Sequence, residues 1–139
     1  GFLKIAGADM DVEKAMEIWR RNQKPVEGML ELLSQLKKNY KLGSISVISK
    51  EWFDFKTGKF NLNYYFDMIA TSGYTGISKP DKSIYELVLR NMKIRPEETI
   101  YIDDDENNLV PARSLGMRTI LFRNSGDLEM SLREMGIIL

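Results

Sequence analysis

The sequence predicts an α/β fold in which one parallel sheet lies between two layers of helices. Four short apolar runs, the expected strands, alternate with longer amphipathic stretches along the 139 residues. Strands separated by helices of this length need crossover connections, which are right-handed and make the strands parallel. The third run ends abruptly in Asp103, Asp104 and Asp105. Because ligands in open α/β sheets bind beyond the carboxyl ends of strands, this cluster also indicates where a site lies.

Each element follows from its own local pattern. Helices are expected where apolar residues recur at helical spacing after a capping residue or a proline, as Asp11 and Pro25 provide. Strands are expected where a short run is rich in β-branched and aromatic residues. In chain order these patterns predict a helix over 12–21, a helix that starts at Pro25 and ends near Lys38, strands over 42–48 and 66–71, a helix over 82–92, a strand over 99–103, a helix over 107–115, a strand over 118–122 and a helix over 127–135.

The composition excludes several mechanisms. The chain has no His and no Cys, so a Ser-His-Asp triad, a thiol nucleophile and a Cys/His zinc site are impossible. Acidic and basic residues balance at 20 each, which gives no electrostatic footprint for nucleic acid or an anionic membrane. No apolar run in the sequence approaches the roughly 20 residues that span a bilayer, and its first residues do not resemble a signal peptide. We expect one domain's worth of core in a cytoplasmic protein.

The acidic cluster at Asp103, Asp104 and Asp105 has two interpretations. Adjacent carboxylates repel one another, and a hard cation such as Mg²⁺, which prefers oxygen ligands, would neutralise them. Alternatively, the cluster is an acidic loop in which Asp105 caps the next helix. Because neighbouring residues on a strand point to opposite faces, Asp103 and Asp104 cannot both ligate one ion unless the backbone turns between them.

Two further polar features fall near predicted strand ends. Ser46 and Ser49 lie at or just past the end of the first strand, where a hydroxyl can donate to a phosphate oxygen, although Ser49 is better placed as a helix cap. Lys79 precedes Pro80, which fits a first helical turn and holds Lys79 extended. An isolated lysine is usually a solvated surface residue. Lys79 is therefore a candidate site residue only in combination with the other motifs of the sequence.

The order of these features resembles the haloacid dehalogenase-like (HAD) superfamily. The matching stretches are Ser46, then K-P-D at 79–81, then I-D-D-x-x-x-N at 102–108, followed by A-R-S-L-G-M at 112–117. The resemblance covers roughly Pro25 to Phe122. It implies a three-layer Rossmann-like parallel sheet of the HAD type, with residues 25–139 as the core domain.

The resemblance also implies a chemistry. Members transfer a phosphoryl group to an aspartate and hydrolyse the acyl phosphate with water, so we expect a Mg²⁺-dependent phosphatase that acts on a small phosphorylated metabolite. In the family's pattern Ser46 binds phosphate, Lys79 is the catalytic lysine beside the nucleophile and the phosphate, Asp104 ligates the metal, Asp103 supports a metal-bound water, and Asn108 is the supporting polar position.

The sequence departs from the family at the first motif, D-x-D-x-T, which carries the nucleophile after a central strand. The upstream D-x-D is Asp9-Met10-Asp11, but Lys4 and Gly7 interrupt the run before it and Glu13 replaces the Thr. The usual first strand and motif are therefore expected to be missing. Residues 1–24 are then expected to be the last helices of a cap domain, and a degenerate first motif at Asp9-Met10-Asp11 is the alternative.

Loss of the first strand would leave an empty slot between the strands that end at Ser46 and Asp104. The unpaired N–H and C=O groups of such a slot cost ~1–3 kcal/mol each when buried. Phe2 to Ala8 could fill the slot, as could a second chain or a missing N-terminal segment of a longer protein. Without an attacking carboxylate the chain alone is expected to be inactive.

Three other functions share some of these features. A phosphoacceptor receiver module also places aspartates, Ser or Thr, and Lys on a parallel sheet, but in a different chain order. A HAD-like binding or regulatory domain would keep the fold without catalysis. Dehalogenation needs no Mg²⁺, so the carboxylate pair argues against it. The aromatic residues between Trp52 and Phe66 are expected to pack the core and the helices rather than to form a ligand site.

Overall fold

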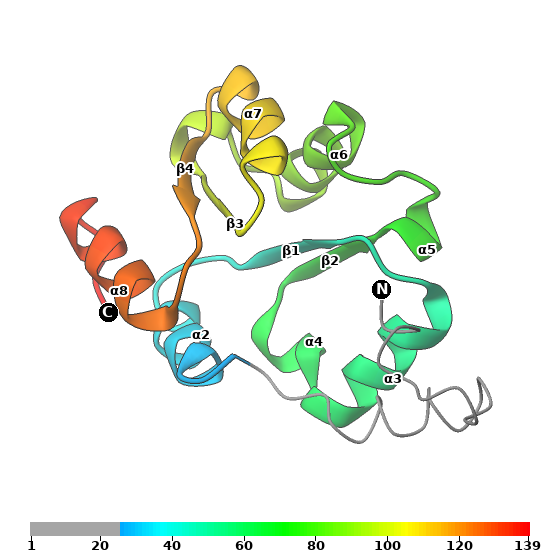
Figure 1. Cartoon of the computed structure of the whole chain (residues 1–139), viewed down its shortest axis with the longest axis horizontal. Helices are drawn as coiled ribbons and strands as arrows, with labels where there is room; N and C mark the ends of the chain where they lie inside the picture. The colour runs from blue at the N-terminus through cyan, green and yellow to red at the C-terminus, as the bar shows by residue number, and fades with distance from the viewer. Residues whose placement is uncertain (1–25) are drawn as a thin grey trace, which may run out of the picture.

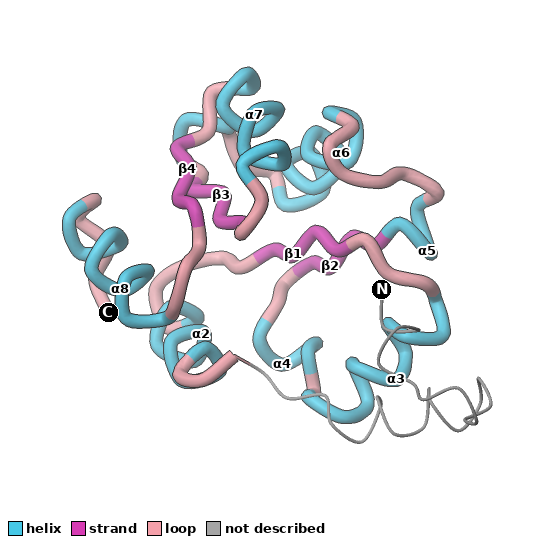
Figure 2. The backbone as a smooth tube through the Cα atoms, viewed as in Figure 1, coloured by secondary structure: helices cyan, strands magenta, loops and turns pink. Residues whose placement is uncertain are grey.

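The computed structural model describes residues 26–139 of the chain (Figure 1). The helix expected over 12–21, the Asp9-Met10-Asp11 sequence and the expected cap segment 1–24 lie outside the described residues. Helices and short parallel strands alternate through the rest of the chain, as the sequence predicts (Figure 2). No helix within residues 26–139 is long and apolar enough to cross a membrane.

The first half contains α2 (Met29–Lys37), β1 (Gly43–Ser46), α3 (Lys50–Phe60), α4 (Leu62–Tyr65) and β2 (Met68–Thr71). In α2, Leu32 and Leu36 lie one turn apart and are buried on the same face. The Ser49 side chain accepts a hydrogen bond from the Trp52 amide and so caps α3, as predicted. The C-cap of this helix is Asn61, whose φ of 52° lies in the left-handed region. None of the residues of α3 is buried.

The second half contains α5 (Ser72–Thr75), α6 (Lys82–Met92), the 3₁₀ turn η2 (Pro96–Glu98), β3 (Ile100–Asp103), α7 (Glu106–Leu115), β4 (Arg118–Leu121) and α8 (Ser125–Glu134). Asp81 and Asp105 accept hydrogen bonds from amides two residues further on, which confirms Asp105 as a helix cap. Most predicted boundaries agree within two residues, but α3, α4 and α5 were not predicted. The second strand starts at Met68 and not at residue 66, because Phe66 is the C-cap of α4 and its amide donates to the Leu62 carbonyl.

The strands form two separate parallel pairs. β1 pairs with β2, with Gly43 opposite Met68, and β3 pairs with β4, with Ile100 opposite Arg118. No strand within the described residues joins β1 to β3. The space between these two strands is a cavity of about 510 Å³ with mostly apolar walls, which we call the interstrand slot. The sequence predicts an empty slot at this place for a chain without the first strand, and that prediction also concerns residues 1–25, which lie outside the described residues.

Two hydrophobic clusters lie on opposite faces of the strands and complete the three layers. The first joins α6 and α7 to β2, and its Ile84 and Tyr85 are 0% exposed. The second joins α2 and α8 to β4 around Leu32 and Leu128. In Figure 1, α6 and α7 lie above the β1–β2 pair, and α2, α3 and α4 lie below it. Side chains of both clusters also line the interstrand slot, which therefore passes through the centre of the fold.

The aromatic residues between Trp52 and Phe66 pack largely in pairs. The ring centroids of Trp52 and Phe55 are 5.9 Å apart, and those of Tyr64 and Tyr65 are 5.1 Å apart, both edge to face. None of the aromatic residues in this stretch is buried. The prediction of helix packing is therefore confirmed, whereas the prediction of core positions is wrong, because α3 packs mainly on α4 and α5 at the periphery of the described fold.

Candidate active site

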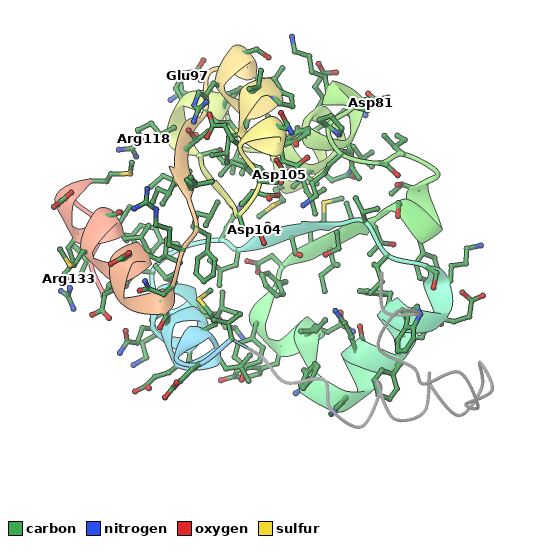
Figure 3. All side chains as sticks on the ribbon, viewed as in Figure 1. Asp81, Glu97, Asp104, Asp105, Arg118 and Arg133 are labelled. Atoms are coloured by element: carbon green, nitrogen blue, oxygen red, sulfur yellow. The ribbon has the colours of Figure 1, made fainter. Side chains whose placement is uncertain are left out.

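Five residues that the sequence singles out meet at the carboxyl ends of the strands. Ser46 ends β1, Asp103 ends β3, Asp104 follows it, Lys79 precedes α6 and Asn108 lies in the first turn of α7. All five line one cavity of about 580 Å³. They come together because parallel strands place their carboxyl ends at the same edge. Figure 3 shows Asp104 where β3 ends, on the side that faces β1.

Asp103 is the most constrained residue of the site, being 8% exposed. Its Oδ2 accepts hydrogen bonds from Lys79 Nζ at 2.6 Å and from the Tyr101 hydroxyl at 2.8 Å. Its Oδ1 accepts from the Asp105 amide at 2.9 Å and from Asn108 Nδ2 at 3.3 Å. Burial acts to raise the pKa of Asp103, but these four donors, with Lys79 foremost, lower it to about 2. The carboxylate is therefore ionised at neutral pH and fully hydrogen-bonded.

Lys79 is held by this carboxylate, and its side chain is only 14% exposed. Lys79 is therefore not the solvated surface residue that an isolated lysine usually is. The prediction that Pro80 lies in the first turn of a helix is wrong, because Asp81 is the N-cap of α6 and Pro80 lies in the turn before it. Lys79 therefore leaves the backbone just ahead of this turn. One of its three ammonium donors is used by Asp103, which leaves the others for a ligand in the cavity.

Asp104 has the opposite character to Asp103. It is exposed, and it has no hydrogen bond or ion pair with any residue of 26–139. Mg²⁺ is usually bound through one or two carboxylates together with waters and a phosphate oxygen, so Asp104 fits part of such a coordination shell. No group of three or more acidic side chains in the described part of the chain is arranged to hold a metal. Further ligands would have to come from elsewhere.

The loop after Ser46 is fixed by two residues that sequence reasoning missed. The Ser72 hydroxyl accepts a hydrogen bond from the Ile48 amide at 2.9 Å and donates to the Ile48 carbonyl at 3.3 Å. A Cβ on Gly73 would lie only 2.5 Å from the Lys50 amide nitrogen, so a side chain does not fit there. The available signal was the position of Ser72-Gly73 directly after the second strand, at the same sheet edge as Ser46.

Two tyrosines behind Asp103 were also missed. Tyr101 lies two residues before Asp103 on the same face of β3, and its ring meets that of Tyr85 edge to face at 5.0 Å. The Tyr85 hydroxyl donates to the Asn108 carbonyl at 2.7 Å. Burial raises the pKa of both tyrosines, and the Asp103 carboxylate raises that of Tyr101 further. Both hydroxyls therefore remain protonated donors. Tyr101 could have been found from its spacing, because a residue two positions before Asp103 on a strand lies on the same face of the sheet.

These features define a three-layer α/β protein with a polar site at the carboxyl ends of its parallel strands. A sequence profile of the haloacid dehalogenase-like hydrolases matches residues 7–122. The chain therefore belongs to the haloacid dehalogenase-like hydrolase family, as its motifs predict.

Relatives and solved structures agree with this assignment. The chain is 35% identical over 104 residues to drimenol cyclase drtB of Aspergillus calidoustus, covering 72% of this chain and 20% of that protein. It is 29% identical over 134 residues to flavin mononucleotide hydrolase 1 of Arabidopsis thaliana, covering 96% of this chain and 54% of that protein. A HAD family enzyme from Bacteroides thetaiotaomicron, crystallised with magnesium and inorganic phosphate, shares the fold with a TM-score of 0.72 at 22% identity, over 88% of this chain and 65% of that one. The chain thus spans well under two thirds of both relatives.

Proposed function

We propose that this chain is part of a Mg²⁺-dependent phosphatase that hydrolyses a small phosphomonoester through an aspartyl-phosphate intermediate. The observation that carries the proposal is the convergence of Ser46, Lys79, Asp103 and Asp104 on one cavity at the strand ends. Two comparisons support it, since one relative is named for the hydrolysis of a phosphate ester and one structural neighbour was crystallised with magnesium and phosphate.

Each residue has a role that suits its surroundings. The Ser46 hydroxyl, which has no hydrogen-bond partner within residues 26–139, would donate to a phosphate oxygen. Lys79 would place positive charge beside the phosphoryl oxygens, where charge develops during in-line transfer. Asp104 would hold Mg²⁺, which when bound would act as a Lewis acid on the phosphate. Asp103 and Asn108 would support these groups.

Asp103 is better suited to holding Lys79 than to binding a metal-bound water. A carboxylate has about four lone-pair sites, and Asp103 already accepts four hydrogen bonds. With a pKa of about 2, it is protonated in only about one molecule in 10⁵ at pH 7, so it is also a poor general acid. We therefore assign the general acid, like the nucleophile, to a segment outside the described residues.

We place that segment in the interstrand slot. Lys79, Asp103 and Asp104 line both the slot and the site cavity, so a strand between β1 and β3 would end beside them. Its carboxylate would attack phosphorus while the alcohol leaves with a proton, and water would then hydrolyse the acyl phosphate to release inorganic phosphate. The residues around Asp9 match the first motif poorly, since Lys4 and Gly7 interrupt the preceding run and Glu13 replaces the Thr. We therefore propose that a preceding segment or a second chain supplies this strand. Residues 1–24 would then be cap helices.

The test is an assay of the purified chain with a generic aryl phosphate and Mg²⁺, alone and joined to the segment encoded upstream. Loss of a nucleophile can reduce turnover by around 10⁶, so we expect activity only with the segment restored. Robust activity of the short chain that Asp9→Asn abolishes would instead make Asp9-Met10-Asp11 the first motif. Phosphate binding without turnover in the extended protein would support a non-catalytic binding domain.

A further inference from the structure

Tyr101 contacts the proposed site but takes no part in the chemistry described above. Its hydroxyl donates to Asp103 Oδ2 at 2.8 Å, and the same oxygen accepts Lys79 Nζ at 2.6 Å. Asp103 Oδ2 therefore accepts hydrogen bonds from both the Tyr101 phenol and the Lys79 ammonium group. A phenylalanine ring would fill the same space, so the contact with Asp103 comes from the hydroxyl and not from packing.

The surroundings of Tyr101 fix its hydroxyl in this position. Tyr101 and Asp103 leave β3 on the same face, so the strand itself sets the spacing between them. The Tyr101 ring packs edge to face on Tyr85, with an interplanar angle of 68°. Tyr85 is fully buried in the cluster formed by α6 and α7. The phenol is thus tied to the best-packed part of the molecule.

The terminal torsion of an aspartate side chain is broad, so hydrogen bonds have to fix the carboxylate plane. The Asp105 amide and Asn108 hold Oδ1, whereas Oδ2 is held by Tyr101 and Lys79 together. Without the Tyr101 hydroxyl, Lys79 would be the remaining donor on Oδ2, and the carboxylate and the ammonium could move together.

We propose that Tyr101 is a positioning residue which, by holding Asp103 Oδ2, keeps the Lys79 ammonium directed into the site cavity. The significance of this position for phosphate binding rests on the proposed function, but the positioning itself does not. Tyr85 offers the comparison variant, because Tyr85→Phe removes a neighbouring phenol that donates to the Asn108 carbonyl and interacts with the Tyr101 hydroxyl but makes no hydrogen bond to Asp103.

The first measurement is hydrogen exchange of the Lys79 ammonium, followed by nuclear magnetic resonance on the chain with ¹⁵N-labelled lysine. The ammonium signal that is absent from the spectrum of Lys79→Arg is assigned to Lys79. A charge-assisted hydrogen bond is worth enough for Tyr101→Phe to speed this exchange about tenfold, and Tyr85→Phe should change it less than twofold. Equal acceleration in the two variants, or none in Tyr101→Phe, would overturn the proposal. So would absence of a Lys79 signal from the wild type.

A second measurement needs no variant and remains decisive if Tyr101→Phe does not fold. Deuterium exchange of each tyrosine hydroxyl shifts its Cζ resonance, and we expect the Tyr101 hydroxyl to exchange slowly in the wild-type chain. Fast exchange would show that the hydroxyl is not held by Asp103 and would overturn the proposal.

The third measurement separates this proposal from the proposed function. Inorganic phosphate is titrated with Mg²⁺ into the protein extended by its upstream segment, using wild type, Tyr101→Phe, Lys79→Met and the double variant. If Tyr101 acts through Lys79, Tyr101→Phe should weaken binding in the wild type but not in the Lys79→Met background. Additive losses would overturn the positioning role. Failure of the wild type to bind phosphate would count against the proposed function, while the exchange rates would still decide the role of Tyr101.

Discussion

The strands β1 and β3 each run into a capped helix, α3 after Ser49 and α7 after Asp105, yet the two units differ in how firmly they hold their polar ends. Asp103, at the end of β3, accepts four hydrogen bonds, whereas the Ser46 hydroxyl at the end of β1 has no partner within residues 26–139. α7 buries three residues and α3 buries none. The β3 side of the site is therefore organised before any ligand binds, and the β1 side depends on the Ser72 contact.

The largest expected effect tests whether the organised β3 side carries the chemistry. In the extended protein, Lys79→Ala should reduce phosphatase turnover by about 10²–10³, the usual loss when one donor to the developing charge is removed. Lys82→Ala is the matched control, because Lys82 is exposed and starts α6 one turn away. Comparable losses in both variants, measured as turnover at saturating substrate, would remove the distinction between the two lysines.

The next test compares the two helices directly. Leu109→Ala removes a side chain of α7 that is 0% exposed, so we expect a loss of about 2–5 kcal/mol in the free energy of unfolding. Phe55→Ala in α3 removes a larger but only half-buried ring and should cost about 1 kcal/mol. Urea denaturation of the chain measures both values. A larger loss from Phe55→Ala would mean that α3 is the better-anchored helix.

The pH dependence of stability tests the hydrogen bonding of Asp103. Its pKa lies at about 2 in the folded chain against an ordinary value of 3.8, so the unfolded chain takes up a proton first as the pH falls. The resulting stabilisation, about 2 kcal/mol, should be present above pH 5 and be lost as the pH falls through 4 to 2. Urea unfolding of wild type and of Asp103→Asn over this range isolates the contribution, which the variant should lack.

The smallest effect concerns the exposed carboxylates beyond β3. Asp104→Asn should weaken Mg²⁺ binding about tenfold, or about 1.4 kcal/mol, because the Asp104 carboxylate accepts no hydrogen bond from residues 26–139. Asp105→Asn should change it far less, because Asp105 Oδ1 accepts the Asn107 amide as a helix cap. Calorimetric titration of the extended protein with Mg²⁺ compares the two, and equal losses would contradict the assignment of Asp104.

The predicted parts of the molecule are those that depend on local patterns. The helix over 82–92 is confirmed at both ends because the apolar residues that predict it all lie within this one segment. The meeting of Ser46, Lys79 and Asp103 was also predictable, since it follows from motif order and from strands that are parallel. Within residues 26–139 no strand joins β1 to β3, and the expected loss of the first strand stays a prediction because the candidate segment lies outside that range.

The parts that were not predicted depend on contacts between distant segments. The sequence around Tyr101 predicts a strand, but the use of its hydroxyl depends on where Lys79 arrives from another loop. The Ser72–Ile48 contact likewise joins the loop after β1 to the start of α5, and only the β1–β2 pairing brings the two together. α3 was not predicted beyond its Ser49 cap because its apolar residues have no clear helical period and none of them is buried.

Two strand edges that face each other across an apolar space are open templates for any other extended chain. Within residues 26–139, β1 and β3 have such edges on the two sides of the interstrand slot. Natural proteins cover, shorten or charge their strand edges because uncovered ones promote aggregation and domain swapping. Copies of the chain in which the slot is empty should therefore associate through these edges as their concentration rises. A strand in the slot, whether from the same protein or from a second chain, would pair with both edges and prevent this association.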